Sequence, residues 1–167
     1  RIVYKKIENK GIAANTNAAA QLAAGEYLAL ADHDDVLAPH ALYTMGQAIL
    51  QLRQQGEPDG FVYSDEALFS KSIRRPSAAH FKPDYAPDYL LCCNYICHLA
   101  VFKKALWDEL GGERPECDGS QDHDLFLRLL ERTGGAAHVP QVLYYWRVHA
   151  GSTSGGTEAK PYVAAAA

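Results

Sequence analysis

An excess of basic residues is absent from this chain. Its 167 residues include 16 Lys and Arg against 20 Asp and Glu, which gives a formal net charge of -4 at pH 7. Proteins that bind nucleic acid usually present a basic surface, so nucleic acid is not an expected partner. Long apolar runs are absent too, since none approaches the roughly 18 residues that a membrane helix needs. No signal peptide opens the sequence, and we expect no transmembrane segment in it.

Paired cysteine motifs are also absent. The four cysteines form no CxxC pair and no evident disulfide framework; they are Cys92, Cys93, Cys97 and Cys117. His98 beside Cys97 does not by itself make a zinc site, and we expect reduced thiols that pack as small hydrophobic side chains. These absences predict a cytoplasmic protein, either free or peripheral at the inner face of the membrane.

What the chain does have is the pattern of one α/β domain. It is long enough for a real core, and 48% of its residues are hydrophobic. In the first half, strands are expected over 2–7, 26–31 and 60–64, with helices over 12–24 and from Pro39 to Gly56. This alternation predicts a largely parallel sheet with helices on its faces.

The second half is expected to complete the same domain. We expect a loop over 67–88, helices over 88–93, 103–110 and 121–133, strands over 96–102 and 137–149, and a mobile polar segment over 150–160. Both ends look cut, because a strand stands at the first residues and a helix begins at the last ones. We therefore expect residues 1–167 to be a single-domain fragment of a longer protein.

An acidic cluster follows the expected strand over 26–31. Asp32, Asp34 and Asp35 lie there, and Asp65 follows the next strand. Ligands of parallel α/β sheets bind outside the carboxyl ends of the strands, which is where these carboxylates are expected. Divalent cations such as Mg²⁺ prefer oxygen ligands, so the cluster is a candidate metal site. The alternative is a solvated acidic turn that caps the following helix.

The sequence DGSQDHDLFLRLLERTGG contains two aspartates with different expected positions. At helical spacing, Asp122 lies within the apolar stripe of Leu125, Phe126, Leu129 and Leu130. Asp124 lies on the opposite face, four residues before Arg128, where an ordinary surface ion pair is expected. Asp122 is therefore a candidate general base. The alternative is a helix-capping role beside Ser120.

A third candidate group follows the last expected strand. Arg147 and His149 precede a small polar segment that contains Ser152. Arginine and hydroxyl groups contact phosphate readily, and imidazole is a common metal ligand. A lone surface histidine usually has no such role, so this group depends on its context.

That context is a resemblance to a known family. Five blocks stand in order: NKGIAANTNAAAQLAAGEYLALADHDD, YSDEALF, FKPDYAPDYLLCCNYICHLAVFKK, GSQDHDLFLRL and YYWRVHAGSTS. Together they resemble the inverting family 2 glycosyltransferases of the bacterial branch that builds surface polysaccharides. The resemblance spans nearly the whole chain and implies the GT-A fold, a Rossmann-like, mostly parallel sheet flanked by helices, here lacking its first strand and its last helix.

The resemblance also implies roles for individual residues. Asp32 and Asp34 match the Asp-x-Asp motif that binds the donor's diphosphate through Mg²⁺ or Mn²⁺, and His149 would be a further metal ligand. Asp122 matches the general base. The donor-binding positions that it implies, together with Asp65 from the strand-end argument, are Asn9, Gly11, Asn17, Asp32, Asp65, Arg147 and Ser152.

Three departures from the family pattern matter. Gln121 replaces the Glu of the usual Glu-Asp form, which removes a charge beside the base. The Gln-x-x-Arg-Trp signature of processive synthases is absent, because Trp146 precedes Arg147. The family's first strand and following loop, which hold much of the nucleoside, are missing, so the fragment alone is expected to bind donor poorly.

The expected activity is transfer of one sugar, with inversion, from a nucleotide-diphosphate sugar to an acceptor hydroxyl. The acceptor would be a saccharide or a lipid-linked saccharide. A GT-A-like nucleotidyltransferase is the alternative enzyme, since it also uses metal-bound aspartates on such a sheet. A non-catalytic carbohydrate-binding remnant is the alternative from another class.

Overall fold

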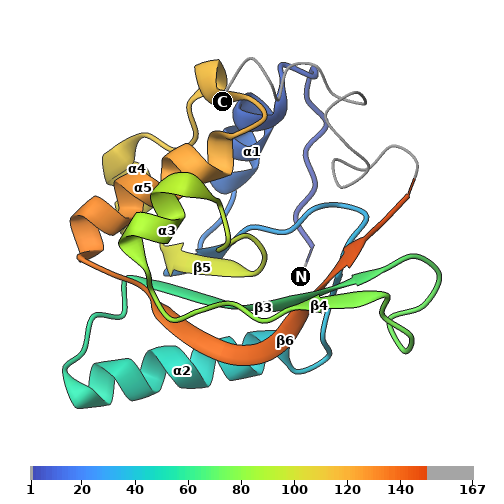
Figure 1. Ribbon diagram of the computed structural model, residues 1–167. Helices are drawn as coiled ribbons and strands as arrows, with labels where there is room; N and C mark the ends of the chain where they lie inside the picture. The colour runs from blue at the N-terminus through green and yellow to red at the C-terminus, as the bar shows by residue number, and fades with distance from the viewer. Residues whose placement is uncertain (1, 150–167) are drawn as a thin grey trace.

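A six-stranded mixed sheet forms the centre of the protein (Figure 1). The computed structural model describes residues 2–149. The strands are β1 (Tyr27–Ala29), β2 (Val36–Leu37), β3 (Phe61–Phe69), β4 (Ala78–His80), β5 (Ala100–Lys103) and β6 (Ala137–Arg147). Their order is β1-β5-β3-β6-β2, and β4 pairs with β3 outside this path.

The α/β class is confirmed, but the sheet is mixed rather than largely parallel. Only β3 and β6 are parallel neighbours, and every other pairing is antiparallel. The expected direction does hold for β1 and β3, because both run antiparallel to β5, which lies between them. The alternation of strands and helices correctly predicted that β1 and β3 run in the same direction. It did not predict that β5 lies between them.

Helices cover both faces of the sheet (Figure 1). The long helix α2 (Ala41–Gln55) covers one face. The remaining helices lie on the other face: α1 (Ile12–Ala20), α3 (Pro87–Cys92), α4 (Lys104–Leu110), the short 3₁₀ helix η1 (Pro115–Cys117) and α5 (Gln121–Thr133). None of the helices within residues 2–149 is both long and apolar enough to cross a bilayer.

The two-residue period of β3 divides its side chains between two cores. Phe61 and Tyr63 belong to the cluster that packs against α5, with Phe126 at 5.3 Å from Phe61 between ring centroids. Val62 points to the opposite cluster, where Met45 of α2 is buried. A strand that is buried on both faces usually reads as an apolar run, and residues 61–63 of β3 follow this rule, whereas the buried residues 64–66 are polar or charged.

Several expected boundaries are confirmed. α5 spans 121–133 as expected, and α2 ends before Gly56, although it begins at Ala41, after Pro39 rather than with it. Helix α4 and strand β6 also lie where the sequence placed them.

Other boundaries were wrong. Residues 2–10 form no strand, and α1 ends at Ala20, so its expected last turn is absent. β3 continues to Phe69 through a bulge around Asp65, because β4 pairs with its second half. The expected loop over 67–88 is therefore partly strand, and Asp65 lies inside a strand rather than after one. The expected mobile segment over 150–160 lies outside the described residues.

Candidate active site

A cavity of about 280 Å³ lies where the segment after β1 approaches the start of α5. Small-molecule sites usually enclose about 300–1,000 Å³, so this cavity suits a compact ligand or one part of a larger ligand. Apolar side chains line it together with hydroxyl, carboxyl, imidazole and amide groups. The polar lining residues are Thr16, Asp32, His98, Glu113, Gln121 and Asp122.

Strand β6 holds the acidic loop after β1 in place. The Tyr144 hydroxyl accepts a hydrogen bond from the Asp32 backbone N–H (3.0 Å) and donates one to Asp35 Oδ2 (2.7 Å). The Arg147 backbone N–H donates to Asp35 Oδ1 at 2.7 Å, and Arg147 Nε donates to the Asp34 carbonyl oxygen at 2.6 Å. The Asp32 carboxylate therefore reaches the cavity from a fixed loop.

One group of side chains in the described residues has the spacing of a metal site. Ligand atoms of Asp32, Asp35 and His98 lie within 4.8 Å of one another. Carboxylate oxygens suit Mg²⁺ and Mn²⁺, and imidazole nitrogen suits the transition metals. Burial raises the pKa of Asp35 above its usual value, and the hydrogen bonds from Arg147 and Tyr144 offset only part of this effect.

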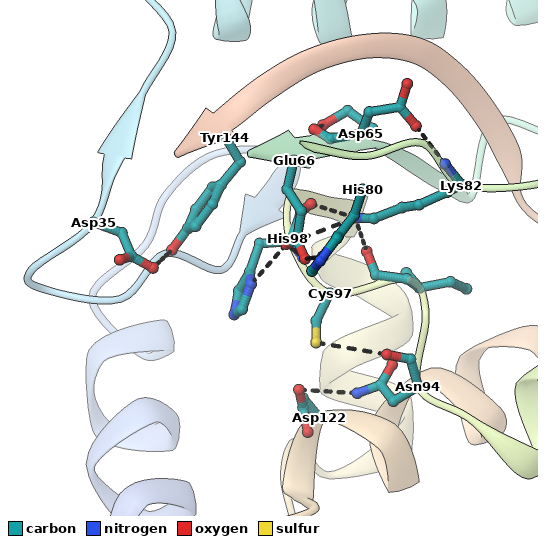
Figure 2. A network of polar contacts seen from close by, with 12 residues as sticks. Asp35, Asp65, Glu66, His80, Lys82, Asn94, Cys97, His98, Asp122 and Tyr144 are labelled. Carbon is teal, nitrogen blue, oxygen red and sulfur yellow. Dashed lines mark hydrogen bonds and ion pairs between the residues drawn. The ribbon is translucent and has the colours of Figure 1, made fainter. Parts of the chain in front are cut away.

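Glu66 fixes the position of His98 through contacts with its backbone and its ring (Figure 2). Its buried carboxylate accepts a hydrogen bond from the His98 backbone N–H at 2.6 Å and lies 3.1 Å from His98 Nδ1. His80 Nδ1 is 2.9 Å from the other carboxylate oxygen, and Lys82 Nζ is 3.9 Å from Oε2. Burial opposes the charge on Glu66, but the His98 and Lys82 contacts outweigh it and hold its pKa below the usual value. The other ring nitrogen of His98 is left for a ligand.

The predicted ligands Asp34 and His149 also lie together. His149 Nε2 is 3.0 Å from Asp34 Oδ2, where Asp34 is half-buried and His149 is exposed. Burial opposes the charge of Asp34, but the His149 contact, a hydrogen bond from its own backbone N–H and the nearby His33 together outweigh that effect and lower its pKa. The structure thus brings two of the three predicted metal ligands into contact, with Asp32 on the same loop.

Asp122 occupies the place that the helical pattern predicted. The four apolar residues of its stripe are all buried: Leu125, Phe126, Leu129 and Leu130. Its Oδ2 accepts a hydrogen bond from Asn94 Nδ2 at 3.0 Å (Figure 2). Its Oδ1 accepts one from the His123 backbone N–H at 2.8 Å. Ser120 begins the helix without a side-chain cap. Asp122 therefore both binds a helix N–H and faces the cavity, so the two expected roles are not exclusive.

The expected ion pair of the second aspartate is confirmed. Arg128 Nη2 and Asp124 Oδ2 are 2.6 Å apart, and both side chains are largely buried rather than on the open surface. Asp124 consequently supports α5 and does not line the cavity.

The cavity also contains a carboxyl group that the sequence analysis missed. Glu113 is only 3% exposed, and its Oε2 has no hydrogen-bond partner. Burial, reinforced by the nearby charge of Asp122, raises the pKa of Glu113 from 4.5 to about 7. Glu113 follows the Gly-Gly pair after α4, in a stretch whose sequence gave no functional signal.

Comparison with known families decides the class of the protein. The model of the family described as "Glycosyl transferase family 2" matches residues 1–111. The chain belongs to glycosyltransferase family 2.

Curated relatives agree with this family 2 assignment. The chain is 40% identical over 165 residues to the uncharacterized protein y4gI of Sinorhizobium fredii, which covers 97% of this chain and 17% of that protein. It is 36% identical over 124 residues to the O-antigen biosynthesis protein RfbC of Myxococcus xanthus, covering 74% of this chain and 9% of that protein. The family 2 chain thus spans less than a fifth of the length of these relatives.

A solved structure confirms the GT-A-type fold. The structure of S. aureus TarS 1-349 in complex with UDP-GlcNAc matches 93% of this chain and 46% of that chain, with a TM-score of 0.62 and 15% identity. At this identity the likeness concerns the fold alone.

Within this family 2 chain, the predicted nucleotide-side residues make local structural contacts. Asn9 Oδ1 accepts a hydrogen bond from the Gly11 backbone N–H at 3.2 Å. Gly11 has φ +102°, and a Cβ there would lie 2.3 Å from Asp118 Oδ2. Asp118 in turn accepts hydrogen bonds from the first two backbone N–H groups of α1, those of Ile12 and Ala13, at 3.2 and 2.8 Å. Gly11 therefore allows a distant carboxylate to cap α1.

Asn17 and Asp65 are likewise used inside the protein. The Asn17 side chain accepts a hydrogen bond from the Glu113 backbone N–H (2.9 Å) and donates one to its carbonyl (2.8 Å). Asp65 Oδ1 accepts from the Lys82 backbone N–H and lies 2.9 Å from His138 Nε2. Neither residue lines the cavity, so their donor contacts stay predictions.

The remaining predicted residues divide between β6 and the undescribed end. Arg147 fixes the acidic loop, and its guanidinium lies 4.5 Å from the centre of the Phe69 ring. Ser152 lies outside the described residues.

Besides Glu113, the sequence did not predict Asn94 and His98 as site residues. Both lie in NYICH, residues 94–98 of the third family block, and their polar side chains were the available signal.

Proposed function

We propose that this chain transfers a single sugar from a nucleotide-diphosphate sugar to an acceptor hydroxyl, with inversion at the anomeric carbon. The observation that carries the proposal is that Asp32 and Asp122 line one cavity in a family 2 chain. Two carboxylates with separate duties, one on the leaving-group side and one on the nucleophile side, fit a single in-line displacement.

Asp122 is the proposed general base. Hydrogen bonds from Asn94 and from the His123 backbone N–H orient its carboxylate, and each oxygen keeps a further lone pair. In the proposed step Asp122 accepts the proton of the acceptor hydroxyl while that oxygen bonds to the anomeric carbon and the bond to the diphosphate oxygen breaks. General bases contribute about 10²–10⁴-fold to such steps.

A divalent cation, Mg²⁺ or Mn²⁺, fits the acidic loop. We propose Asp32, Asp34 and His149 as its ligands, because both oxygens of Asp35 already accept hydrogen bonds. The side chain of His149 is also more accessible than that of His98, with exposures of 50% and 17%. When bound, such an ion stabilises the negative charge on the departing nucleoside diphosphate.

The donor and the biological role rest on the relatives. TarS has been solved with UDP-GlcNAc, and RfbC is named for O-antigen biosynthesis. These names support a nucleotide-sugar donor and a part in cell-surface polysaccharide synthesis. For the acceptor we propose a saccharide or a lipid-linked saccharide. We place the reaction in the cytoplasm or at the inner face of the membrane. Membership of a glycosyltransferase family disfavours the nucleotidyltransferase alternative.

The test is turnover of nucleotide sugars by the full-length protein. A panel of UDP-, dTDP- and GDP-sugars is incubated with Mn²⁺ and candidate saccharide acceptors, and release of nucleoside diphosphate is measured. Proton NMR of the product then reports the anomeric configuration. We expect release from at least one donor and an inverted product. Binding of a donor without turnover of any panel member would favour the carbohydrate-binding alternative, and a retained configuration would refute the in-line step.

A further inference from the structure

One oxygen of the buried Glu113 carboxyl group, Oε2, has no hydrogen-bond partner among the described residues. Only two buried side-chain atoms among residues 2–149 lack a hydrogen-bond partner, namely Asn94 Oδ1 and Glu113 Oε2. Leaving such a group unpaired costs stability, because the group loses its hydrogen bonds to water on folding and gains none in return. Of these two residues, Glu113 lines the cavity. A ligand in the cavity is therefore the natural source of the missing partner.

The structure fixes the backbone of Glu113 independently of its side chain. Asn17 bonds both the N–H and the carbonyl of Glu113, at 2.9 and 2.8 Å. The packing behind it is equally tight, since a Cβ on Gly112 would lie 2.3 Å from Asn17 Oδ1. The carboxyl group is therefore not needed to hold this segment, yet its position on the cavity wall is well defined.

The rest of the cavity wall suits a sugar. Apolar side chains such as Ile12, Leu30, Phe126 and Trp146 offer surfaces for the C–H groups of a pyranose ring. Asp32 and Asp122 mark the donor and acceptor sides of the proposed reaction, and both line the same cavity. A ring between them presents hydroxyl groups to the wall, and a hydroxyl can both donate to and accept from a carboxyl group.

We propose that Glu113 is a sugar-binding residue whose Oε2 hydrogen-bonds a hydroxyl group of the sugar that occupies the cavity. This inference rests on the proposed function and adds a specificity-determining contact to it. The hydroxyl belongs either to the donor's sugar or to the acceptor's terminal sugar, which share this chemistry. A pKa near 7 leaves a large fraction of Glu113 protonated at neutral pH, so it can donate as well as accept.

The donor arm of the test compares nucleotides with and without their sugar. Calorimetry measures the Kd of UDP and of UDP-GlcNAc, UDP-glucose and dTDP-rhamnose for the full-length protein with Mn²⁺. Variants are Glu113→Met, which removes the hydrogen bond, and Glu113→Gln, which keeps one. Glu116→Gln, an exposed glutamate three residues away, is the matched control. If the donor's sugar is the ligand, Glu113→Met raises the Kd of the best nucleotide sugar about tenfold, which corresponds to the loss of one hydrogen bond. The Kd of UDP stays unchanged in Glu113→Met, and Glu113→Gln changes the Kd of UDP and that of the nucleotide sugar less than about threefold.

The acceptor arm uses free monosaccharides. Saturation-transfer NMR measures N-acetylglucosamine, galactose and rhamnose binding in the presence of UDP and Mn²⁺. Loss of a monosaccharide signal in Glu113→Met, with nucleotide-sugar binding intact, assigns the contact to the acceptor and supports the inference. Unchanged binding in both arms overturns the inference while leaving the proposed function in place. No binding of any nucleotide or sugar by the wild type overturns the proposed function, and this inference with it.

Folding is not expected to limit the test. Glu113→Met replaces an unpaired buried carboxyl group with an apolar side chain of similar length, so its thermal unfolding midpoint should equal or exceed that of the wild type. Should it unfold, wild-type affinities for monodeoxy sugars decide instead. At least one deoxy analogue must bind about tenfold more weakly, and equal affinity for all of them overturns the inference.

Discussion

The two acidic regions of the cavity differ in how their charges are stabilised. In the loop after β1, Asp35 accepts hydrogen bonds from Tyr144 and from the Arg147 backbone N–H. Asp34 lies 3.0 Å from His149. At the other side, one Glu113 oxygen has no partner at all. The loop thus has the charges and contacts of a cation site. The segment before α5 instead contains Glu113, whose unpaired oxygen is proposed to bond to a ligand.

The largest expected effect concerns Asp122. Asp122→Asn removes the proposed base but keeps the hydrogen bond to Asn94, so we expect kcat to fall by about 10²–10⁴-fold. Nucleoside diphosphate release measures the rate, and calorimetry should show unchanged donor affinity. Asp124→Asn, which alters only the supporting ion pairs with Arg114 and Arg128, is the control and should keep turnover within several-fold. Full activity in Asp122→Asn would remove Asp122 from the mechanism.

The second expected effect is a pH dependence of stability from Glu113. Its pKa of about 7 in the folded state exceeds the ordinary value of 4.5, so the folded protein binds this proton more tightly than the unfolded chain. The stability contributed by the proton is therefore present below pH 4.5 and is lost as the pH rises through 7. Relative to Glu113→Gln, the wild-type free energy of unfolding should fall by up to about 3 kcal/mol. Urea denaturation between pH 5 and 8 measures it, and parallel curves for the two proteins would refute the assignment.

The third expected effect separates the two histidines near the loop. His149→Ala should weaken Mn²⁺-dependent nucleotide binding by about tenfold or more, because it removes a proposed ligand. His98→Ala is the comparison, since His98 belongs to the cluster with Asp32 and Asp35. Calorimetric titration of Mn²⁺ in the presence of UDP compares them. A larger loss in His98→Ala would move the ion to that inner cluster.

The smallest expected effect concerns the cap of α1. Asp118→Ala removes the acceptor of two backbone N–H groups and should cost about 1–2 kcal/mol of stability. Urea denaturation measures it. Asp108→Ala removes an exposed ion pair with Lys104 four residues away and should cost under about 0.5 kcal/mol. Equal losses in the two variants would contradict the capping role.

The sequence predicted local patterns better than long-range placement. Helix α5 and the buried stripe beside Asp122 followed from periodicity alone, because they depend only on neighbours along the chain. The insertion of β5 between β1 and β3 depends on pairing between distant segments, which periodicity does not record. Asp65 was placed after a strand, because the polar residues 64–66 interrupt the apolar pattern although pairing with β4 and β6 continues the strand.

The candidate site divides in the same way. The acidic loop was recognisable, since three aspartates after a strand stand out locally and match a family motif. The partners that give it shape, Tyr144 and Arg147, lie more than a hundred residues away. Glu113 could not be recognised, because its significance is its burial without a partner, which only the folded structure reveals.

The central claim is that the acidic loop binds a nucleoside diphosphate through a divalent cation. The most direct test is calorimetric titration of UDP and dTDP into the full-length protein, with and without Mn²⁺, for the wild type and Asp32→Ala. We expect binding of at least one nucleotide that requires Mn²⁺ and is lost in Asp32→Ala, with an unchanged unfolding midpoint. Equal binding in the presence and absence of Mn²⁺, or equal binding by Asp32→Ala, would contradict it.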